Sequence, residues 1–572
     1  MTGGSKYEEK IWLKNYGKDV PETVEYEELP MIEALYRSAK DYPDNIALIF
    51  EGYKMKYTEL LEIVERLATA LADMGVEKGD RVALLLPNTI HCVAGFYAIH
   101  RANAIAVSNN PLYSDRELEY QLNNSGSKVL ITIDLLANRM INLRPKTQVK
   151  QIITCGIGDY LPFPKNILFP LVAKGKGFKA EVKKAEEVYT FKEIIAKYPP
   201  NPPKKEIEWE DVACLQYTGG TTGVSKGVML THKNLSCNVQ QSIWSWFPEF
   251  KPTASEETHM GMLPFFHSFG ITCAMNCPIW AGATIVLIPR PEPKPLLDAI
   301  KKYKVTFFAS VPTMYVGMIN HPDLPKYNLS SIKGCFSGSA PLPVEVIERF
   351  EKLAGAAICE GYGLTETAPV THINPFGEGA KRIPGSIGLP VPDTQCKIVD
   401  QEGGTEEMSV GEPGELIIKG PQVMKGYWNM PEETATTLID GWLYTGDIAT
   451  MDEEGYFYIV DRKKDMIIAS GFNVYPREIE EELYKHPKIK EACAIGVPHE
   501  YRGETVKVFV VLKEGETATA EEIIEYCREN IAKYKVPKIV EFRDKLPKSA
   551  IGKILRKELR KEEIKKIAEK KG

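Results

Sequence analysis

The stretch Tyr217-Thr218-Gly219-Gly220-Thr221-Thr222-Gly223-Val224-Ser225-Lys226-Gly227 holds four glycines, three threonines, a serine and a lysine in eleven residues. Glycine tolerates positive φ and has no Cβ, so backbone N–H groups of such a loop can turn toward a ligand. The hydroxyls and the lysine add donors and charge suited to a polyphosphate. The spacing differs from that of the P-loop, because Lys226 follows Ser225 and not a glycine. Apolar runs at 212–215 and 228–230 predict a strand, a loop and a strand within a core, and not a flexible linker.

Apolar segments typical of strands alternate with amphipathic segments typical of helices around this loop. Helices are predicted at 57–74 and 91–101, and strands at 81–86, 104–107, 129–133 and 151–154. A second series of this kind covers residues 211–389, and shorter strands with glycine turns cover 394–450. This alternation predicts an α/β fold, with a large N-terminal domain of two doubly wound sheets and a small β-barrel-like unit.

Five consecutive charged residues, Asp461-Arg462-Lys463-Lys464-Asp465, mark a candidate boundary. They follow an apolar strand-like segment, and a run of charges is unsuited to a core, so we expect a hinge there. Beyond it, residues 476–484 and 520–532 are helix-like and 507–513 are strand-like, which predicts a small α+β domain. The predicted division is therefore an N-terminal domain at 1–460, a hinge at 461–465 and a C-terminal domain at 466–572.

The composition is that of an ordinary globular protein. At 572 residues the chain is too long for one core, and 44% hydrophobic with 26% charged residues is typical of soluble proteins. A formal net charge of −6 gives no indication of a nucleic-acid partner. The eleven cysteines include no CxxC pair and the nine histidines show no metal-ligand spacing. We therefore expect reduced, buried thiols in a cytoplasmic protein and no zinc site.

Two segments bear on membranes. Residues 258–289 form the longest uncharged stretch, but Pro278 and Gly282 interrupt it, so we expect a buried helix, a turn and a strand at 284–288 instead of a membrane span. Residues 161–184 combine an apolar patch with several lysines. Such a segment can contact a membrane surface, and a loop packed on the protein surface is the alternative interpretation. The first 17 residues are polar, with no apolar core of a signal peptide.

Four further groups of residues have side chains suited to binding a ligand or to catalysis. Gly361-Tyr362-Gly363-Leu364-Thr365-Glu366-Thr367 offers a ring for a base, a hydroxyl for a phosphate and a carboxylate, which is the ligand type that Mg²⁺ prefers. Tyr444-Thr445-Gly446-Asp447 places an aspartate after a tight turn, where it can accept from ribose hydroxyls. The others are Arg462 and the segment Pro547-Lys548-Ser549-Ala550-Ile551-Gly552-Lys553-Ile554. Singly, each also fits a structural role, as an N-cap, a turn residue or a solvated charge.

In this order, the five motifs resemble those of the adenylate-forming superfamily, which includes AMP-forming acyl-CoA synthetases, luciferases and adenylation domains. The resemblance covers residues 36–560, and the irregular insert at 161–184 is most similar to that of fatty-acid–CoA ligases. It implies that ATP activates a carboxylic acid to acyl-AMP with release of pyrophosphate. The acyl group then passes to CoA, giving acyl-CoA and AMP. ATP, Mg²⁺ and CoA are the implied cofactors and co-substrate.

The resemblance also implies roles for individual residues. The ATP phosphates would lie against Thr218, Gly219, Gly220, Thr221, Thr222, Gly223 and Lys226. AMP would lie against Gly338, Ser339, Ala340, Gly361, Tyr362 and Gly363, with its ribose at Asp447 and Arg462. The catalytic residues would be Thr365 at the α-phosphate, Glu366 on Mg²⁺, and Lys553 at the carboxylate and α-phosphate. Lys464 would be the pivot between the domains, and Gly471 would border the tunnel for the CoA pantetheine arm.

Two features of the sequence bear on which carboxylic acid is the substrate. The segment 261–283 has no acidic residue, so it offers no counter-ion for the ammonium group of an amino acid, and an unpaired buried ammonium is costly. Gly363 falls where acetate-activating relatives carry a tryptophan that closes the acyl pocket, so a longer acyl group should fit. By the same resemblance, His267 matches a position that gates the acyl pocket, although a core histidine is the alternative. Val311 is a further candidate for the pocket wall.

We therefore predict a medium- to long-chain fatty-acid–CoA ligase. An aryl or short hydroxy-acid–CoA ligase and an acyl-AMP ligase that delivers to a carrier protein stay open within the enzyme class. A non-catalytic acyl-adenylate binder or fatty-acid uptake protein is the alternative from another class, and the presence of Lys553, Glu366 and Asp447 argues against it. The expected partners are small molecules and not nucleic acids. A homodimer, and peripheral contact of a cytoplasmic protein with a membrane, stay open.

Overall fold

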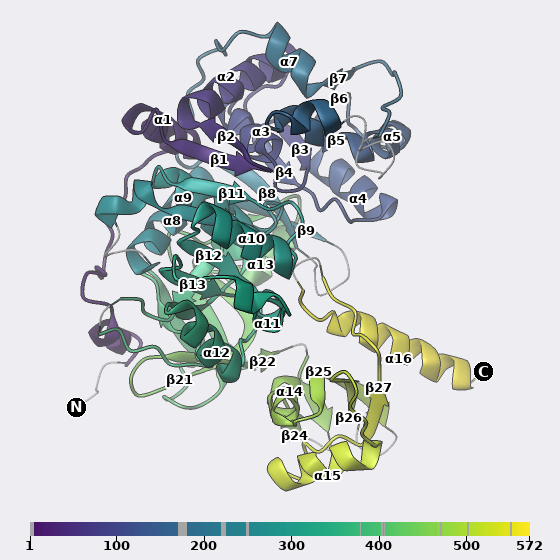
Figure 1. Cartoon of the computed structure of the whole chain (residues 1–572). Helices are drawn as coiled ribbons and strands as arrows, with labels where there is room; N and C mark the ends of the chain where they lie inside the picture. The colour runs from purple at the N-terminus through teal and green to yellow at the C-terminus, as the bar shows by residue number, and fades with distance from the viewer. Residues whose placement is uncertain are drawn as a thin grey trace. The chain divides into compact units, whose positions relative to one another are not determined.

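The computed structural model describes residues 5–169, 180–218, 225–246, 251–377, 379–401, 404, 406–463, 465–469, 472–499, 503–549 and 552–571 (Figure 1). The chain divides into two compact units. We call Lys10–Gln395 with Ile418–Leu443 the N-terminal unit, and Met1–Glu9 with Cys396–Ile417 and Tyr444–Gly572 the C-terminal unit. The hinge predicted at 461–465 lies within the C-terminal unit and stays a prediction.

The first sheet of the N-terminal unit has eight strands in the order β19-β9-β8-β4-β3-β5-β6-β7. The strands from β8 to β7 are parallel to their neighbours, whereas β9 and β19 are antiparallel. Their bounds are β3 (Arg81–Leu85), β4 (Ile105–Ser108), β5 (Val129–Ile133), β6 (Gln151–Cys155), β7 (Val188–Thr190), β8 (Val212–Thr218), β9 (Lys226–Thr231) and β19 (Gly426–Tyr427). Parallel neighbours need crossover connections, which here include α3 (Ile90–Arg101), α4 (Asp115–Ser125) and α5 (Asp134–Leu143).

Local sequence explains where these helices begin and end. Helix α4 begins at a capping box, in which Ser114 Oγ accepts from the N–H of Glu117 and the Glu117 carboxylate accepts from the N–H of Ser114. It ends at Gly126, whose φ of 66° is a left-handed conformation that glycine adopts without strain. The two ends thereby satisfy N–H and C=O groups that the helix itself leaves unpaired.

The second sheet has nine strands in the order β16-β15-β14-β13-β12-β10-β11-β1-β2. The run from β14 to β1 is parallel. The bounds are β1 (Ile46–Phe50), β2 (Tyr53–Lys56), β10 (Thr258–Gly261), β11 (Thr284–Leu287), β12 (Phe307–Ser310), β13 (Gly334–Ser337), β14 (Ala357–Gly363), β15 (Val370–Ile373) and β16 (Leu389–Pro390). Helices α10 (Pro293–Tyr303), α11 (Pro312–Ile319) and α12 (Val344–Ala354) lie together along this sheet (Figure 1).

One hydrophobic core lies between these helices and the nine-stranded sheet. Its fully buried side chains include Leu297, Tyr315 and Phe350 from the helices and Phe308 from β12. Full burial of a large apolar side chain stabilises a fold by about 1.5–3 kcal/mol relative to exposure. The prediction of two mainly parallel α/β sheets is thereby confirmed, because this core and that of the first sheet each join parallel strands to helices.

The uncharged stretch is buried as predicted, with one difference. It contains a π-helix, η5 (Gly270–Asn276), followed by α9 (Cys277–Trp280), a turn with Gly282 at φ 71° and strand β11. All seven residues of the π-helix are buried, so no apolar face distinguishes its period from that of an α-helix in the sequence. All eleven cysteines are buried and free, as predicted. Within the part of the chain that the structure describes, no helix combines the length and apolar character needed to span a membrane.

Two further sheets complete the fold. The small β unit is a five-stranded sheet of β17 (Gln395–Val399), β18 (Gly414–Lys419), β20 (Leu438–Ile439), β21 (Trp442–Met451) and β22 (Phe457–Arg462). The last sheet has the order β24-β23-β26-β25 with β27 beside β26, and comprises β23 (Ile467–Ala469), β24 (Phe472–Val474), β25 (Ile489–His499), β26 (Gly503–Leu512) and β27 (Ile539–Phe542). Helices α14 (Pro476–Lys485) and α15 (Ala520–Asn530) pack on this sheet through Ile479, Leu483 and Ile523, which confirms the predicted small α+β domain.

Candidate active site

Four neighbouring parallel strands lead into the residues predicted to hold AMP and the acyl group. His267 lies in the segment after β10, Val311 directly follows β12, Gly338 directly follows β13, and β14 ends at Gly363. These strands are adjacent in the order β14-β13-β12-β10. Because the carboxyl ends of parallel strands share one edge of a sheet, this edge is where open α/β folds bind ligands. The fold therefore gathers these predicted residues at one edge.

Close backbone contacts define this edge. The N–H of Gly338 donates to the carbonyl oxygen of Ser310 at 3.2 Å. A Cβ at Gly338 would lie 3.1 Å from Cε1 of Phe269 and 3.5 Å from the carbonyl oxygen of Gly361. Ser339 follows with φ 70°, a conformation that non-glycine residues rarely adopt and that is frequent at functional sites. Gly338 thus has no side chain where its backbone approaches Gly361, and Ala340, two residues further on, is exposed.

Gly363 is required by the backbone itself. A Cβ there would lie 1.8 Å from the carbonyl oxygen of Pro369, far inside van der Waals contact. The register between strands β14 and β15 shifts between Tyr362 and Gly363, at the place where the two strands approach one another closely. The structure thus supplies a reason for glycine that does not involve the acyl group. The interpretation of Gly363 as the open floor of an acyl pocket stays a prediction.

Glu366 lies in a short 3₁₀ turn, η7 (Thr365–Thr367), beside strand β19. Its Oε1 accepts a hydrogen bond from the hydroxyl of Tyr427 at 2.8 Å, and its carbonyl oxygen accepts from the N–H of Met424 at 2.8 Å. Burial, and then the negative charge of Glu366, raise the pKa of Tyr427 above its ordinary value. The phenol, which is protonated at neutral pH as tyrosine ordinarily is, donates to the carboxylate.

The phosphate loop connects strands β8 and β9, and its last residue, Lys226, lies near Tyr427. Thr218 ends β8, Lys226 begins β9, and the two residues are paired in register. The buried Nζ of Lys226 forms an ion pair with Glu433, in helix α13 (Pro431–Thr437), and lies 5.0 Å from the ring centroid of Tyr427. Predicted phosphate ligands of this loop that lie outside the described residues are Gly219, Gly220, Thr221, Thr222 and Gly223.

Sequence reasoning missed Tyr427 and Glu433. Tyr427 is 61 residues from Glu366, and Glu433 is 207 residues from Lys226. Pairing at such separations leaves no local pattern, and an aromatic residue after a glycine is too common to single out. The structure links the base of the phosphate loop to Glu366 through Tyr427, and all four residues belong to the N-terminal unit.

The two residues predicted to bind ribose lie opposite one another in the C-terminal unit. Asp447 on β21 and Arg462 on β22 are register partners, with Arg462 Nε 3.5 Å from Asp447 Oδ1. The tight turn that the sequence predicted before Asp447 is not formed: Gly446 lies within strand β21 with φ 69°, and its N–H donates to the carboxylate of Glu415 at 3.0 Å. The buried Asp447 is thereby fixed by backbone pairing, in a geometry where a carboxylate and a guanidinium can share one polar ligand.

Lys553 lies in a tight turn before helix α16 (Arg556–Lys571). Its carbonyl oxygen accepts from the N–H of Ser549 at 2.8 Å, and its N–H donates to Ser549 Oγ at 3.2 Å. Gly552 in this turn has φ 76°. Lys553 belongs to the C-terminal unit, together with Asp447 and Arg462. The predicted pivot Lys464 and tunnel residue Gly471 lie outside the described residues.

The charged run at 461–465 is less exposed than the sequence suggested. Asp461 and Asp465 are both buried. Arg556 bonds the Glu480 carboxylate with two contacts of 2.7 and 2.8 Å, and it also reaches Asp465 at 3.2 Å. Burial raises the pKa of Asp461 and of Glu480. Acidic residues of a charged run can thus form part of a core when an arginine is buried with them.

The carboxylate of Glu366 fits a Mg²⁺ ion that is shared with a nucleotide. Mg²⁺ in such sites is held by one or two carboxylates together with substrate phosphates, and not by a cage of protein ligands. Among the described residues, no group of three or more His, Cys, Asp or Glu side chains could hold a metal ion. The carboxylate of Glu366, beside the phosphate loop, is therefore the candidate protein ligand for Mg²⁺.

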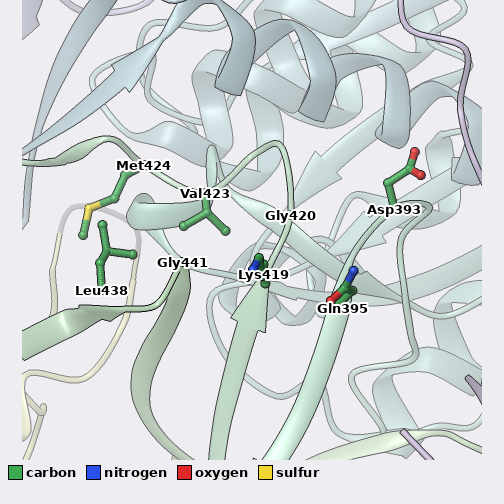
Figure 2. Close-up of a pocket in the computed structure, with 8 residues that line it drawn as sticks. All are labelled: Asp393, Gln395, Lys419, Gly420, Val423, Met424, Leu438 and Gly441. Atoms are coloured by element: carbon green, nitrogen blue, oxygen red, sulfur yellow. The ribbon is translucent and has the colours of Figure 1, made fainter. Parts of the chain in front are cut away.

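A separate cavity of about 390 Å³ lies in the N-terminal unit (Figure 2). Figure 2 shows the apolar side chains of Val423, Met424 and Leu438 grouped on one side, away from Asp393. None of the eight lining residues is a predicted site residue; they are Asp393, Gln395, Lys419, Gly420, Val423, Met424, Leu438 and Gly441. The cavity and the site are linked through Met424, whose N–H donates to the carbonyl oxygen of Glu366.

Known proteins resemble this chain over nearly its whole length. The family model of AMP-binding enzymes matches residues 35–428, and that of the AMP-binding enzyme C-terminal domain matches residues 478–553. A long-chain-fatty-acid–CoA ligase of Bacillus subtilis (strain 168) is 48% identical over 558 residues, covering 97% of this chain and 98% of the relative. That of Yersinia pestis is 42% identical, covering 97% and 99%. A solved structure of an anthranilate CoA ligase in complex with anthranoyl-AMP is 28% identical with a TM-score of 0.83, covering 96% and 99%.

Proposed function

This chain belongs to the AMP-binding enzyme family, and on that basis we propose that it is an ATP-dependent ligase that converts a medium- to long-chain fatty acid to its CoA thioester. The observation that carries the proposal is the 48% identity to a long-chain-fatty-acid–CoA ligase along almost the entire chain. The site geometry supports it, because Glu366, Lys226 and Tyr427 form one cluster at the phosphate loop. ATP and CoA are the proposed co-substrates.

The first half-reaction needs charge neutralisation more than a covalent residue. A carboxylate oxygen attacks the α-phosphorus of ATP, the bond to the bridging oxygen breaks, and pyrophosphate leaves. Attack by an anion on a polyanion is electrostatically opposed, so positioning and positive charge lower the barrier. Lys553 would contact the carboxylate and the α-phosphate, and Lys226 would bind the leaving pyrophosphate. When bound through Glu366 and the phosphates, Mg²⁺ supplies further positive charge.

The second half-reaction needs a path for a thiol. The sulfur of CoA attacks the acyl carbonyl, the bond from that carbon to the phosphate oxygen breaks, and AMP leaves. Lys553 has no role at the carbonyl once the adenylate has formed. We propose that the C-terminal domain turns about Lys464 between the two steps, as conformational gating does in other enzymes, and that Gly471 then borders the pantetheine arm.

The lack of acidic residues in the segment 261–283 favours a fatty acid over an amino acid as substrate. From Gly261 to Ala283 the sequence has no acidic residue, and the segment is largely buried. An aryl or short hydroxy-acid–CoA ligase is the alternative, and the anthranilate ligase shares the fold at lower identity. A non-catalytic binder is disfavoured, since Lys553, Glu366 and Asp447 are all in place.

A panel of acids tests the proposed substrate class. With ATP and CoA present, AMP release is expected for octanoate through palmitate, with kcat/KM at least about 10-fold above that for acetate and benzoate, because each buried methylene adds binding energy. AMP is measured by chromatography, and reactions without CoA or without acid are the controls. Strong turnover with acetate or benzoate, and none with octanoate to palmitate, would exclude the fatty-acid assignment.

Peripheral contact with a membrane also remains a proposal. Phe163, Ile167 and Leu168 are 78%, 61% and 52% exposed, within the irregular segment that the sequence singled out. Ile167 and Leu168 lie in a short helical stretch at 165–169. Three large apolar side chains so exposed within six residues are unusual for a protein surface, and a lipid interface would cover them. A cytoplasmic location and a homodimer stay predictions.

A further inference from the structure

Tyr427 is held in place by strand pairing and by two hydrogen bonds of the backbone around it. Its strand pairs with β9, where Tyr427 faces Val228, and the next residue, Trp428, donates its N–H to the carbonyl oxygen of Gly227 at 2.7 Å. The N–H of Tyr427 donates to Oγ1 of Thr434 at 2.9 Å. Only 5% of the residue is exposed. The ring therefore has a fixed position and cannot follow a mobile partner.

The hydroxyl of Tyr427 donates a hydrogen bond to Glu366, whose side chain can adopt several rotamers. Glu366 has three side-chain torsions and sits in a short turn. Restricting such a side chain when a ligand binds costs conformational entropy. A donor that is already in place when a ligand arrives removes part of that cost from binding.

The same ring also touches the lysine of the phosphate loop. Lys226 Nζ lies 5.0 Å from the ring centroid, within the range of a cation–π contact, and forms an ion pair with Glu433. One side chain thus contacts both the lysine predicted to bind the outgoing phosphates and the carboxylate predicted to bind the metal. Tyr427 itself offers neither charge nor a metal ligand, so it acts through its neighbours.

We propose that Tyr427 is a positioning residue of the phosphate site, whose hydroxyl fixes Oε1 of Glu366 and so turns Oε2 toward a metal–nucleotide complex. The proposal rests on the proposed function only in assigning the metal to Glu366. The ring, which Phe would retain, packs against Lys226, so the Tyr427→Phe variant removes the hydrogen bond alone. Replacement of a residue that hydrogen-bonds to a metal ligand and orients it typically weakens metal affinity by 10- to 100-fold.

The test measures metal binding without turnover. Full-length Tyr427→Phe protein is titrated with Mn²⁺ in the presence of α,β-methylene-ATP, which cannot release pyrophosphate, and free Mn²⁺ is followed by electron paramagnetic resonance. The expected result is Mn²⁺ affinity about 10-fold weaker than in the wild type. Affinity for α,β-methylene-ATP alone is expected to be unchanged.

The Tyr26→Phe variant is the matched control. Tyr26 donates its hydroxyl to Asp393 Oδ2 at 2.8 Å, so this variant also removes a tyrosine–carboxylate bond from the N-terminal unit. It is expected to bind Mn²⁺ like the wild type, while both variants lower the unfolding temperature by similar amounts. Should Tyr427→Phe not fold, Thr434→Val, which loosens the backbone of Tyr427, is expected to weaken Mn²⁺ binding in the same direction.

Equal Mn²⁺ affinity in Tyr427→Phe and the wild type would overturn the proposal, as would equal weakening in Tyr26→Phe. If the wild type bound no Mn²⁺ with the nucleotide, the metal role of Glu366 and this proposal would both fall. A wild type that binds Mn²⁺ in a Tyr427-dependent manner, yet activates no fatty acid, would leave this proposal standing and refute the substrate assignment alone.

Discussion

Replacement of Lys553 by alanine is expected to lower acyl-AMP formation from acid and ATP by about 1000-fold. Formation of acyl-CoA from supplied acyl-AMP and CoA is expected to continue near the wild-type rate. The reason is electrostatic: the ammonium offsets charge only while a carboxylate approaches the α-phosphate, and the thiol attacks a neutral carbonyl. The two half-reactions are measured separately, by acid-dependent ATP–pyrophosphate exchange and by thioester formation from synthetic acyl-AMP.

Lys548→Ala is the matched control for this variant. Lys548 lies in the same segment and pairs with Glu491 at 2.6 Å, so its removal changes the net charge equally. It is expected to retain both half-reactions. Similar losses of both half-reactions in Lys553→Ala would contradict the separate role of Lys553 and would indicate a general structural defect.

The Glu366→Gln variant is expected to lose about 100-fold in ATP–pyrophosphate exchange, and the concentration of Mg²⁺ that half-saturates the exchange is expected to rise. Glutamine has nearly the same shape and its amide oxygen can still accept from Tyr427, so the fold around the turn is preserved. The change removes the negative charge that attracts a divalent cation. Exchange rates over a range of Mg²⁺ concentrations measure both effects.

Glu432→Gln provides the control for this second prediction. Glu432 is exposed in the first turn of α13, next to the Lys226 partner Glu433, and its substitution alters the charge of the region equally. The exchange rate and its Mg²⁺ dependence are expected to match the wild type. An unchanged Mg²⁺ dependence in Glu366→Gln would remove Glu366 from the metal site.

The sequence predicted most of the fold because apolar periodicity reports burial directly. Long strands such as Val129–Ile133 and helices such as Ile90–Arg101 were located to within a residue or so. The pairing of Asp447 with Arg462 could also be predicted from the sequence, because two β-strands joined by a short turn pair with one another. The resemblance to a family placed both at the ribose, and the register places them opposite one another.

What the sequence could not predict depends on close approach between distant segments. The structure explains Gly363 by the carbonyl oxygen of Pro369, whereas the sequence suggested only a missing side chain in a pocket. Asp461 appeared to be a solvated charge, and its burial with Arg556 depends on a helix almost 100 residues further along the chain. Tyr427 gave no signal, because its partners lie 61 and 201 residues before it.

The fate of the carboxyl oxygens tests the central claim, which is activation of a fatty acid as its adenylate. Palmitate labelled with oxygen-18 at both carboxyl oxygens is incubated with ATP, Mg²⁺ and CoA, and the products are analysed by mass spectrometry. Because the attacking oxygen stays on phosphorus when the thiol displaces AMP, one labelled oxygen is expected in each AMP and one in each palmitoyl-CoA. Unlabelled AMP, or label in inorganic phosphate accompanied by ADP, would contradict the adenylate route.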